Sequence, residues 1–339
     1  MARTGRQQKD YGRLQEFLEL LKKSPGFASG QSLAKKAGIS RSAVWKHVRR
    51  LRQCGYSIES VHGRGYRLAG GTTHPVPWEL VGILKTSFVG KGRMVYRDSA
   101  DSTQSIAIAL AEKNSDVHGA VVIAEQQSSG RGRMKRKWLS PRGGVWASVV
   151  LKPSIPTAAS TMLPFVAALA VCDAVRQATG LQATLKWPND VMVNGKKAAG
   201  ILLDLSAEAE TVNYAVIGIG INANVDTSKM KILDRESRPA ITSLREELGG
   251  REVNRLGLTK LLFEHLERFY NMLEDSGPEK IVAEWRRRSD MLGKNVSVAQ
   301  QQGRTIDGVA ADINDDGSLL VKTGSGEVNV VSGDVHVSY

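Results

Sequence analysis

The sequence has little of what marks secreted and membrane-embedded proteins. It contains two cysteines in 339 residues, Cys54 and Cys172, and neither belongs to a CxxC pair or a metal-binding cluster. This scarcity excludes a disulfide scaffold and favours a reducing, cytoplasmic compartment. The longest apolar run, Met162–Cys172, contains Pro164 and is too short to span a bilayer, so it predicts a buried helix. The charged N-terminus has no apolar segment of the kind that signal peptides carry, so we expect neither secretion nor membrane contact.

The charge is distributed unevenly along the chain. Residues 1–68 carry 15 Lys or Arg and 4 Asp or Glu, so this segment holds +11 of the total formal charge of +13. The rest of the chain is nearly neutral, and the overall composition is that of a soluble globular protein. The length allows two or three domains. One basic domain attached to a neutral one indicates a nucleic-acid partner for the first segment only.

The basic segment has the pattern of a winged helix-turn-helix. Apolar residues recur at helical spacing over 14–21, a second short helix fits 30–37, and a third fits 41–52 after a Gly-containing turn. Two short strands, 56–61 and 66–68, enclose a Gly-Arg-Gly tip and predict the wing. A basic helical bundle that binds an acidic protein is the alternative interpretation.

Composition predicts three domains. Residues 70–77 are rich in Gly, Thr and Pro without apolar periodicity, which predicts a linker after a first domain at 1–70. The segment 78–288 mixes helices and strands without strict βαβ alternation, so it predicts a mixed sheet rather than a doubly wound one. It includes a β-hairpin with an Asn194-Gly195 turn. Short strands separated mostly by Gly and Asp turns over 291–339 predict a small barrel.

The densest motif of the central segment is the basic glycine loop Gly130–Trp138, which reads GRGRMKRKW. Glycine lets a backbone approach phosphate closely, and arginine neutralises phosphate charge. Such a loop is also suited to closing over a reactive intermediate and excluding water. Taken alone, the motif fits a solvated basic loop or an RNA-binding patch equally well.

A second motif, KWPND at 186–190, precedes the hairpin that carries Lys197. Small residues follow this lysine up to Gly200, and they leave room for a ligand beside it. A surface lysine on a hairpin is the alternative if Lys197 is considered by itself.

Two further patterns are weaker than they first look. The segment Gly218–Asn222 reads GIGIN after a strand, but it lacks the third glycine of a dinucleotide-binding fingerprint, so we reject that interpretation. Residues 312–317 resemble the start of a calcium loop, yet position twelve is Thr323 rather than Glu. An Asp-Gly β-turn explains this segment better.

Taken together and in this order, the basic loop, the KWPND motif, Lys197–Ile201 and Gly218–Asn222 resemble the biotin protein ligases. The first domain resembles the winged helix of those members that double as the biotin operon repressor, and the last resembles the family's SH3-like domain. The resemblance covers essentially the whole chain. It implies an α+β multidomain protein with a central mixed-sheet domain related to class II aminoacyl-tRNA synthetases. It also implies ATP- and Mg²⁺-dependent formation of biotinyl-5′-AMP and transfer of biotin to a lysine of a biotin carboxyl carrier protein.

The resemblance assigns site residues by matching position. The residues assigned to biotin are Ser102, Thr103, Gln104, Gln127, Arg131, Gly132, Arg133, Trp138, Lys197 and Gly200. The residues assigned to the nucleotide are Arg133, Arg136, Lys197 and Asn222. Lys197 and Arg131 would neutralise the two anionic reactants, and Asp190 would orient the attacking amine. No metal ligand from the protein is implied beyond the Mg²⁺ that accompanies ATP.

The chain departs from the family pattern at two places. Gln104 follows Ser102-Thr103 where the family often has Asn, and Met134-Lys135 stands where it often has Arg-Gly. The second change removes a glycine hinge, so it bears on the order and closure of the basic loop.

For DNA, the resemblance implies a homodimer that binds a palindromic operator more tightly when the adenylate is bound. The residues assigned to this contact are Ser40, Arg41, Ser42, Lys46, His47, Arg49, Arg50 and Arg64. Three other functions remain open: a ligase whose winged helix no longer represses, a lipoate or octanoyl ligase of the same fold, and a non-catalytic regulator that senses biotin.

Overall fold

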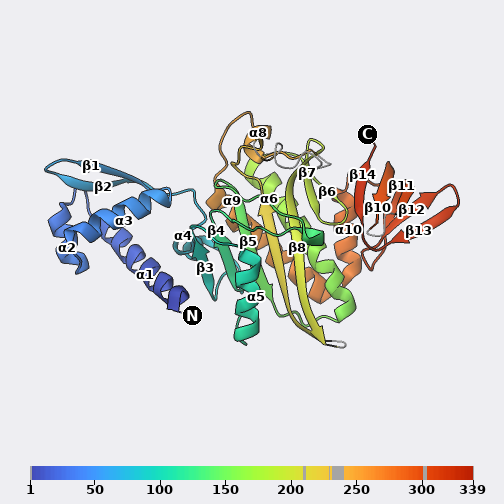
Figure 1. The fold of residues 1–339 in the computed structure, drawn as a ribbon, viewed down its shortest axis with the longest axis horizontal. Coiled ribbons are helices and arrows are strands. Elements are labelled where there is room, and N and C mark those ends of the chain that lie inside the picture. Colours follow the sequence, from blue (N-terminus) through green and yellow to red (C-terminus); the bar gives the residue numbers. More distant parts are fainter. Residues whose placement is uncertain (1, 209–210, 229, 231–239, 301–303, 339) are drawn as a thin grey trace. The chain divides into compact units, whose positions relative to one another are not determined.

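A computed structural model describes residues 2–208, 211–228, 230, 240–300 and 304–338, with side chains from residue 11 onward. The chain divides into two compact units, Met1–Glu79 and Leu80–Tyr339, each described by itself below. Figure 1 shows the elements of both units in sequence colours. The predicted three-domain division at 1–70, 78–288 and 291–339 stays a prediction.

The first unit consists of three helices and a two-stranded ribbon. The elements are α1 (Ala2–Lys22), α2 (Gly30–Ala37), α3 (Arg41–Gln53), β1 (Ser57–Val61) and β2 (Gly65–Gly70). Ser40 caps α3 by accepting a hydrogen bond from the Ala43 backbone N–H at 3.2 Å, and α2 ends at Gly38 in the left-handed conformation. The predicted apolar residues of α1 and α3 are buried and form the core of this unit.

The segment predicted as a linker packs onto the first unit. The Thr72 hydroxyl donates to the Cys54 carbonyl at 2.5 Å. The indole of Trp78, on α4 (Pro77–Ile83), donates to the Tyr56 hydroxyl at 2.7 Å, and that hydroxyl donates to Glu79. The unit boundary therefore lies after Glu79, beyond the end of the Gly- and Pro-rich stretch.

A seven-stranded mixed sheet forms the centre of the second unit. Its order is β3-β4-β5-β9-β8-β7-β6, with β3 and β4 parallel and every other neighbouring pair antiparallel. The strands are β3 (Met94–Arg97), β4 (Val121–Ala124), β5 (Val145–Leu151), β6 (Ala183–Lys186), β7 (Asp190–Val193), β8 (Lys196–Glu208) and β9 (Thr211–Ile221). The mixed sheet confirms the prediction from the absence of βαβ alternation. The β7–β8 hairpin turns at Asn194-Gly195, both with positive φ, as predicted.

Helices pack against this sheet and against one another. They are α5 (Thr103–Lys113), α6 (Leu163–Thr179), α8 (Leu244–Glu247), α9 (Arg255–Ser276) and α10 (Pro278–Arg288). Short 3₁₀ turns, η1 and η2, cover Arg133–Lys135 and Thr157–Met162. The stretch Thr157–Thr179 is long and apolar enough to cross a membrane, but 72% of its most apolar window is buried inside the protein. It is longer than the apolar run considered in the sequence, and its burial agrees with the predicted core helix.

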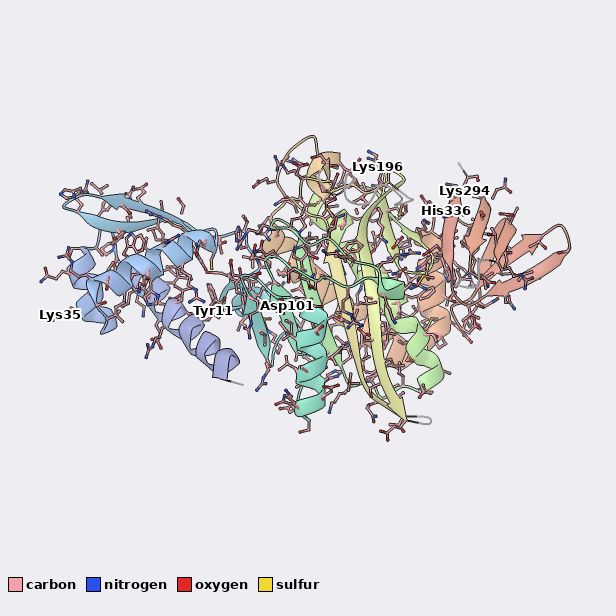
Figure 2. The ribbon with its side chains drawn as sticks, viewed as in Figure 1. Tyr11, Lys35, Asp101, Lys196, Lys294 and His336 are labelled. Atoms are coloured by element: carbon pink, nitrogen blue, oxygen red, sulfur yellow. The ribbon has the colours of Figure 1, made fainter. Side chains whose placement is uncertain are left out.

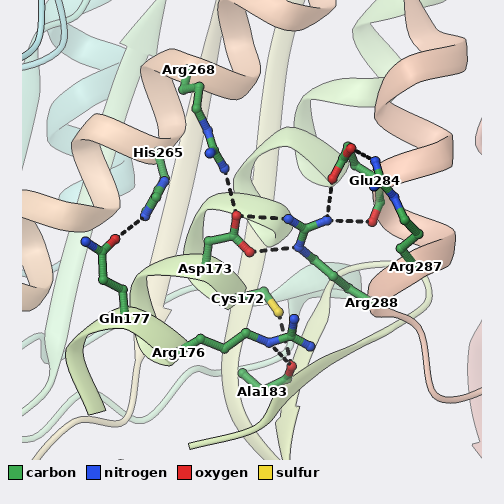
Figure 3. A network of polar contacts seen from close by, with 10 residues as sticks. All are labelled: Cys172, Asp173, Arg176, Gln177, Ala183, His265, Arg268, Glu284, Arg287 and Arg288. Atoms are coloured by element: carbon green, nitrogen blue, oxygen red, sulfur yellow. Dashed lines mark hydrogen bonds and ion pairs between the residues drawn. The ribbon is translucent and has the colours of Figure 1, made fainter. Parts of the chain in front are cut away.

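A polar network joins α6, α9 and α10 (Figure 3). Asp173 accepts from Arg268 at 2.7 Å and from Arg288 at 2.7 and 3.0 Å. Burial by itself raises the pKa of Asp173, but the hydrogen bonds and charges of the two arginines outweigh burial and hold it below its usual range. The helices are therefore fixed to one another by charge as well as by apolar packing.

The last five strands form a separate antiparallel sheet. Its order is β13-β12-β11-β10-β14. The strands are β10 (Asn295–Ala299), β11 (Thr305–Ile313), β12 (Leu319–Thr323), β13 (Gly326–Val330) and β14 (Asp334–Val337). The Trp187 indole donates to the Gly317 carbonyl at 2.8 Å, and Arg286 pairs with Asp312 at 2.6 Å. These contacts anchor the terminal sheet beside the KWPND segment.

Candidate active site

A cavity of about 740 Å³ opens over β8 and β9 and is bordered by the basic loop, the KWPND segment and β14. Every residue predicted for the ligase site lines it. They are Ser102, Thr103, Gln104, Gln127, Arg131, Gly132, Arg133, Arg136, Trp138, Asp190, Lys197, Gly200 and Asn222. Fold geometry thus brings together residues that are spread over 121 positions of the sequence.

One part of the cavity is lined by neutral polar groups that are fixed by hydrogen bonds. The Gln127 carbonyl oxygen accepts from the Thr103 backbone N–H at 2.7 Å and from its hydroxyl at 3.1 Å. The Ser148 hydroxyl lies 2.9 Å from both the Thr103 hydroxyl and the Gln104 carbonyl oxygen. Ser102 caps α5 through the Ser105 N–H. Side chains constrained in this way are preorganised to hydrogen-bond an uncharged polar ligand group.

Both the nitrogen and the oxygen of the Gln104 side-chain amide take part in this network. Its amide donates to Asp204 and to the Val216 carbonyl, both at 2.9 Å. A Cβ at Gly218 would lie 2.6 Å from the Gln104 side-chain oxygen, so only glycine leaves space for it. The departure from the family's usual asparagine is therefore accommodated within β9.

Trp138 lies over glycines of β8 and β9. A Cβ at Gly200 would meet its ring at 2.9 Å, and a Cβ at Gly220 would meet Nε1 at 2.5 Å. The glycines of the GIGIN segment thus sit inside a strand and make room for side chains, which agrees with rejecting a dinucleotide-binding turn. The buried Trp138 Nε1 has no hydrogen-bond partner among the described residues.

Two lysines line the cavity near the KWPND segment. The Lys197 ammonium is 2.5 Å from Asp190 Oδ1 and 5.3 Å from the centre of the Trp138 ring. Lys186 is 6% exposed. Its burial lowers the pKa of Lys186, and the charge of Lys197 lowers it further, while Asp190 opposes both effects.

The basic loop is held by partners from three other segments. Arg131 pairs with Asp204 at 3.4 Å, Arg133 donates to Asn189 at 3.1 Å, and Arg136 pairs with Asp334 of β14. Burial by itself raises the pKa of Asp334, but the hydrogen bond and charge of Arg136 outweigh burial and keep it below the usual value. The loop's guanidinium groups are thus directed toward the cavity.

The loop turns at Met134 and Lys135, where φ is 53° and 60°. These are left-handed conformations that glycine adopts at little cost. The predicted loss of a glycine hinge therefore corresponds to a specific feature of the structure. Met134 and Lys135 adopt backbone conformations that are strained for residues other than glycine.

Asn222, the last predicted residue of the cavity, is fully buried. Its amide donates to the Thr242 carbonyl at 3.0 Å, and its side-chain oxygen has no hydrogen-bond partner among the described residues. An acceptor left in this state at a cavity wall is suited to a ligand N–H.

Sequence reasoning missed several residues of the cavity wall. They include Lys186, Asn189, Ser148, Leu202, Asp334 and His336. Lys186 and Asn189 lie within the KWPND motif, so the motif itself was the signal. Asp334 and His336 come from β14 of the terminal sheet, and no local pattern marks them (Figure 2 labels His336).

The residues predicted to contact DNA divide into two groups on the first unit. Arg41, Ser42, Lys46 and Arg49 are exposed along α3. By contrast, His47 stacks on Phe17 of α1 with ring centres 5.2 Å apart, and Arg50 lies over the Tyr11 ring at 4.6 Å. Ser40 serves as the cap of α3, and Arg64 of the wing lies over Phe27 at 4.5 Å.

Three protein-family models match successive segments of the chain. Residues 13–67 match an HTH domain, residues 96–222 match the biotin/lipoate A/B protein ligase family, and residues 291–337 match a biotin protein ligase C-terminal domain. The matched segments coincide with α1–β2, with most of the mixed sheet, and with the terminal sheet.

Individual relatives match over nearly the full length. The chain is 36% identical to the Bacillus subtilis "Bifunctional ligase/repressor BirA", covering 92% of this chain and 94% of that protein. It is 28% identical to the Escherichia coli protein of the same name, covering 87% and 88%. An Aquifex aeolicus biotin protein ligase structure in complex with biotin and ATP superposes with a TM-score of 0.61 at 27% identity, covering 73% of this chain and 99% of that one.

Proposed function

The chain belongs to the biotin protein ligases of the bifunctional ligase/repressor type, and we propose that it activates biotin with ATP and passes it to a carrier-protein lysine. The observation that carries the ligase activity is the shared cavity. It combines a fixed neutral polar network, a tryptophan wall and the cations Arg131, Arg133 and Lys197. Such a site can bind a neutral ring system and an anionic phosphate group side by side.

In the first step, a carboxylate oxygen of biotin attacks the α-phosphorus of ATP, and pyrophosphate leaves. Both reactants are anionic, so positive charge must be placed where they meet. Lys197, held between Asp190 and Trp138, supplies that charge, and Arg131 supports it. The Asn222 side-chain oxygen would accept from the nucleotide, and Arg136 would lie near it.

In the second step, the carrier lysine amine attacks the carbonyl carbon of the mixed anhydride. The amide bond forms, the bond from carbon to the phosphate oxygen breaks, and AMP leaves while the amine loses its proton. Asp190 is the carboxylate proposed to orient this amine. Because it already pairs with Lys197, its first contribution is to position that lysine.

Mg²⁺ is proposed to enter with the phosphates of ATP. Within the described ranges, no group of three or more His, Cys, Asp or Glu stands close enough to hold a metal ion. The cavity's acidic residues Asp190 and Asp334 are instead engaged with Lys197 and Arg136. The ion would shield phosphate charge in addition to these cations.

Three finer assignments belong to the same proposal. The central domain is related to class II aminoacyl-tRNA synthetases, the terminal five-stranded sheet is an SH3-like barrel, and the protein works in the cytoplasm. The mixed sheet, the strand order of the terminal sheet and the scarcity of cysteine support them.

The test of the ligase activity is pyrophosphate release by the full chain with ATP and biotin, followed by biotin transfer to a biotin carboxyl carrier protein. We expect release that depends on biotin and is absent with lipoate or octanoate. Release with those acids instead would favour a lipoate or octanoyl ligase. Biotin binding without any release would identify a non-catalytic sensor.

The first unit is proposed to bind a palindromic operator of biotin genes as a homodimer, with adenylate as corepressor. A two-fold protein needs two half-sites related by the same symmetry. The charge of +11 on residues 1–68 and the exposed cations of α3 support this proposal. Adenylate would tighten DNA binding if it favours the dimer. Equal affinity for operator and random DNA in every ligand state would leave a ligase that does not repress.

Substitutions in α3 should distinguish residues that contact DNA phosphates from residues that recognise the base sequence. Arg50→Ala should weaken binding to all sequences alike and lower the salt slope by about one unit, because a phosphate contact is lost. Arg41→Ala, at the start of α3, should instead lower the preference for operator over random DNA. The measurement is a titration at several salt concentrations with and without biotin plus ATP, and identical behaviour of the two variants would contradict the assignment.

Arg133→Gly should release the adenylate about tenfold faster while changing biotin dissociation less than twofold. The guanidinium faces the phosphate that only the adenylate presents, and a charge-assisted hydrogen bond contributes roughly 1.5–3 kcal/mol. Lys135→Met is the matched control, since it removes the same charge from the same loop at a residue outside the cavity wall without placing a glycine at its left-handed φ. The measurement is the dissociation rate of each ligand from both variants. If Arg133→Gly accelerates the dissociation of adenylate and of biotin equally, the loop does not discriminate between them.

Lys186 should make ATP binding sensitive to alkaline pH. Its lowered pKa means that the ammonium loses its proton, and its attraction for phosphate, at a lower pH than an exposed lysine. We expect ATP affinity to fall as pH rises through that pKa. Lys186→Met should bind ATP weakly at neutral pH and lose less on further increase. A Lys186→Met profile parallel to that of the unmodified protein would remove Lys186 from ATP binding.

A further inference from the structure

The solvent face of α3 carries an aromatic residue that has no part in the core. Ser42, Trp45, Lys46 and Arg49 follow the spacing i, i+3, i+4, i+7 and are all exposed. The buried residues of the same helix are Val44, Val48 and Leu51, on the opposite side. Trp45 is 54% exposed, which is an unusual state for a residue type that is highly buried on average.

The indole is held in place by a neighbour on its own helix. The Arg49 guanidinium lies over the Trp45 ring, 5.6 Å from its centre. His47 and Arg50 of the same helix behave differently, since they pack against aromatic residues of α1. Trp45 and Arg49 therefore form a projecting pair that faces outward from the helix.

The positive charge near this pair indicates the kind of molecule that binds at this face of α3. Arg49 lies over the indole, Arg41 and Lys46 are exposed on the same helix, and α3 contains no acidic residue. A second copy of this basic unit would be repelled at this face, whereas a polyanion would be attracted. Trp45 is the fifth of the thirteen residues of α3, in the half of the helix whose residues reach base edges when a helix-turn-helix enters the major groove.

From this we infer that Trp45 is a sequence-reading residue, whose indole packs against the 5-methyl group of a thymine in each operator half-site while Arg49 holds the ring in place. This inference rests on the proposed DNA-binding function. In the major groove, apolar side chains recognise thymine through that methyl group, which cytosine lacks. Because Trp45 is uncharged, its contribution should appear in sequence preference rather than in salt dependence.

The experiment uses full-length protein and the duplex that it enriches from a random pool, compared with random DNA. Each thymine of the duplex is replaced in turn by uracil, which removes only the methyl group. For the unmodified protein we expect one position in each half-site where uracil weakens binding about fourfold, the effect of one buried methyl group. Trp45→Ala should bind the parent duplex about tenfold more weakly, with random-DNA affinity and salt slope unchanged, and should be insensitive to uracil at that position.

Trp45→Phe keeps a ring and should retain part of the uracil effect. Unchanged affinity for random DNA serves as the folding control for the first unit, and pyrophosphate release by each variant serves as the control for the second. If Trp45→Ala keeps the same uracil-sensitive position, or keeps the ratio of selected to random affinity, the inference fails and the repressor proposal survives. If the unmodified protein enriches no duplex, the repressor proposal fails and the inference fails with it.

Discussion

Replacing Lys197 with alanine should slow adenylate formation about 100-fold or more while leaving the protein folded. The expected size is that of removing one preorganised electrostatic group from the position where charge meets in the transition state. The ammonium is held between the Asp190 carboxylate and the Trp138 ring, so its position is defined before substrates bind. Biotin-dependent pyrophosphate release at saturating ATP measures the effect.

The neighbouring residue offers a matched control. Lys196, labelled in Figure 2, precedes Lys197 on β8. Its side chain pairs with Glu247 at 3.0 Å, and it is not one of the residues that line the cavity. Lys196→Ala removes an equal charge from the same strand and should leave adenylate formation within about twofold, because its side chain lies outside the cavity wall and Glu247 keeps its hydrogen bonds from Thr242 and Asn194. If Lys197→Ala behaves like Lys196→Ala, Lys197 has no role in the chemistry.

Much of the site followed from the sequence because local patterns carried it. The β7–β8 hairpin follows from the Asn194-Gly195 dipeptide, whose positive φ values suit the turn. That turn places Lys197 on β8 with Gly200 three residues further on. Helix α3 follows likewise from its cap and its apolar spacing. At these positions the local preference and the tertiary structure agree.

Other elements could not be predicted because their signals are short or distant. Strands β3 and β6 have four residues each, too few to distinguish a strand from a loop by periodicity, and neither ends at an Asn-Gly turn like the one that marks the equally short β7. The contribution of Asp334 to the cavity depends on how the terminal sheet docks, through contacts such as that between Trp187 and Gly317. No property of the sequence around residue 334 carries that information.

The basic loop lies between these cases. Its glycines and arginines predicted a phosphate-binding segment, and the absence of a glycine at Met134-Lys135 predicted altered hinging. The structure adds that both residues have left-handed φ values, and that Arg131, Arg133 and Arg136 have partners on three different segments. Such partners come from residues distant in the chain, so the sequence indicates the chemistry of the loop but not the contacts that hold it.

The second large effect concerns a buried ion pair that includes Glu125, two residues before Gln127 of the cavity wall. Arg255, at the start of α9, lies 3.1 Å from Glu125, the residue that follows β4, with side chains 4% and 1% exposed. Arg255 also donates to the Gly144 carbonyl at 3.0 Å, and the Tyr96 hydroxyl donates to Glu125 at 3.0 Å. The pair therefore joins a helix to the strand that leads into Gln127.

Arg255→Met should lower the free energy of unfolding by about 3–5 kcal/mol, because it leaves the buried Glu125 charge without its opposite charge. Urea denaturation followed by tryptophan fluorescence measures this loss. The control is Arg142→Met, which breaks a 2.5 Å pair with Asp98 whose side chains are 47% and 55% exposed, and which should cost about 0–1 kcal/mol. We also expect weaker biotin binding in Arg255→Met, since Gln127 follows Glu125 by two residues and holds Thr103 in the polar network. Similar losses for the two arginine variants would show that the Arg255–Glu125 pair does not support the site.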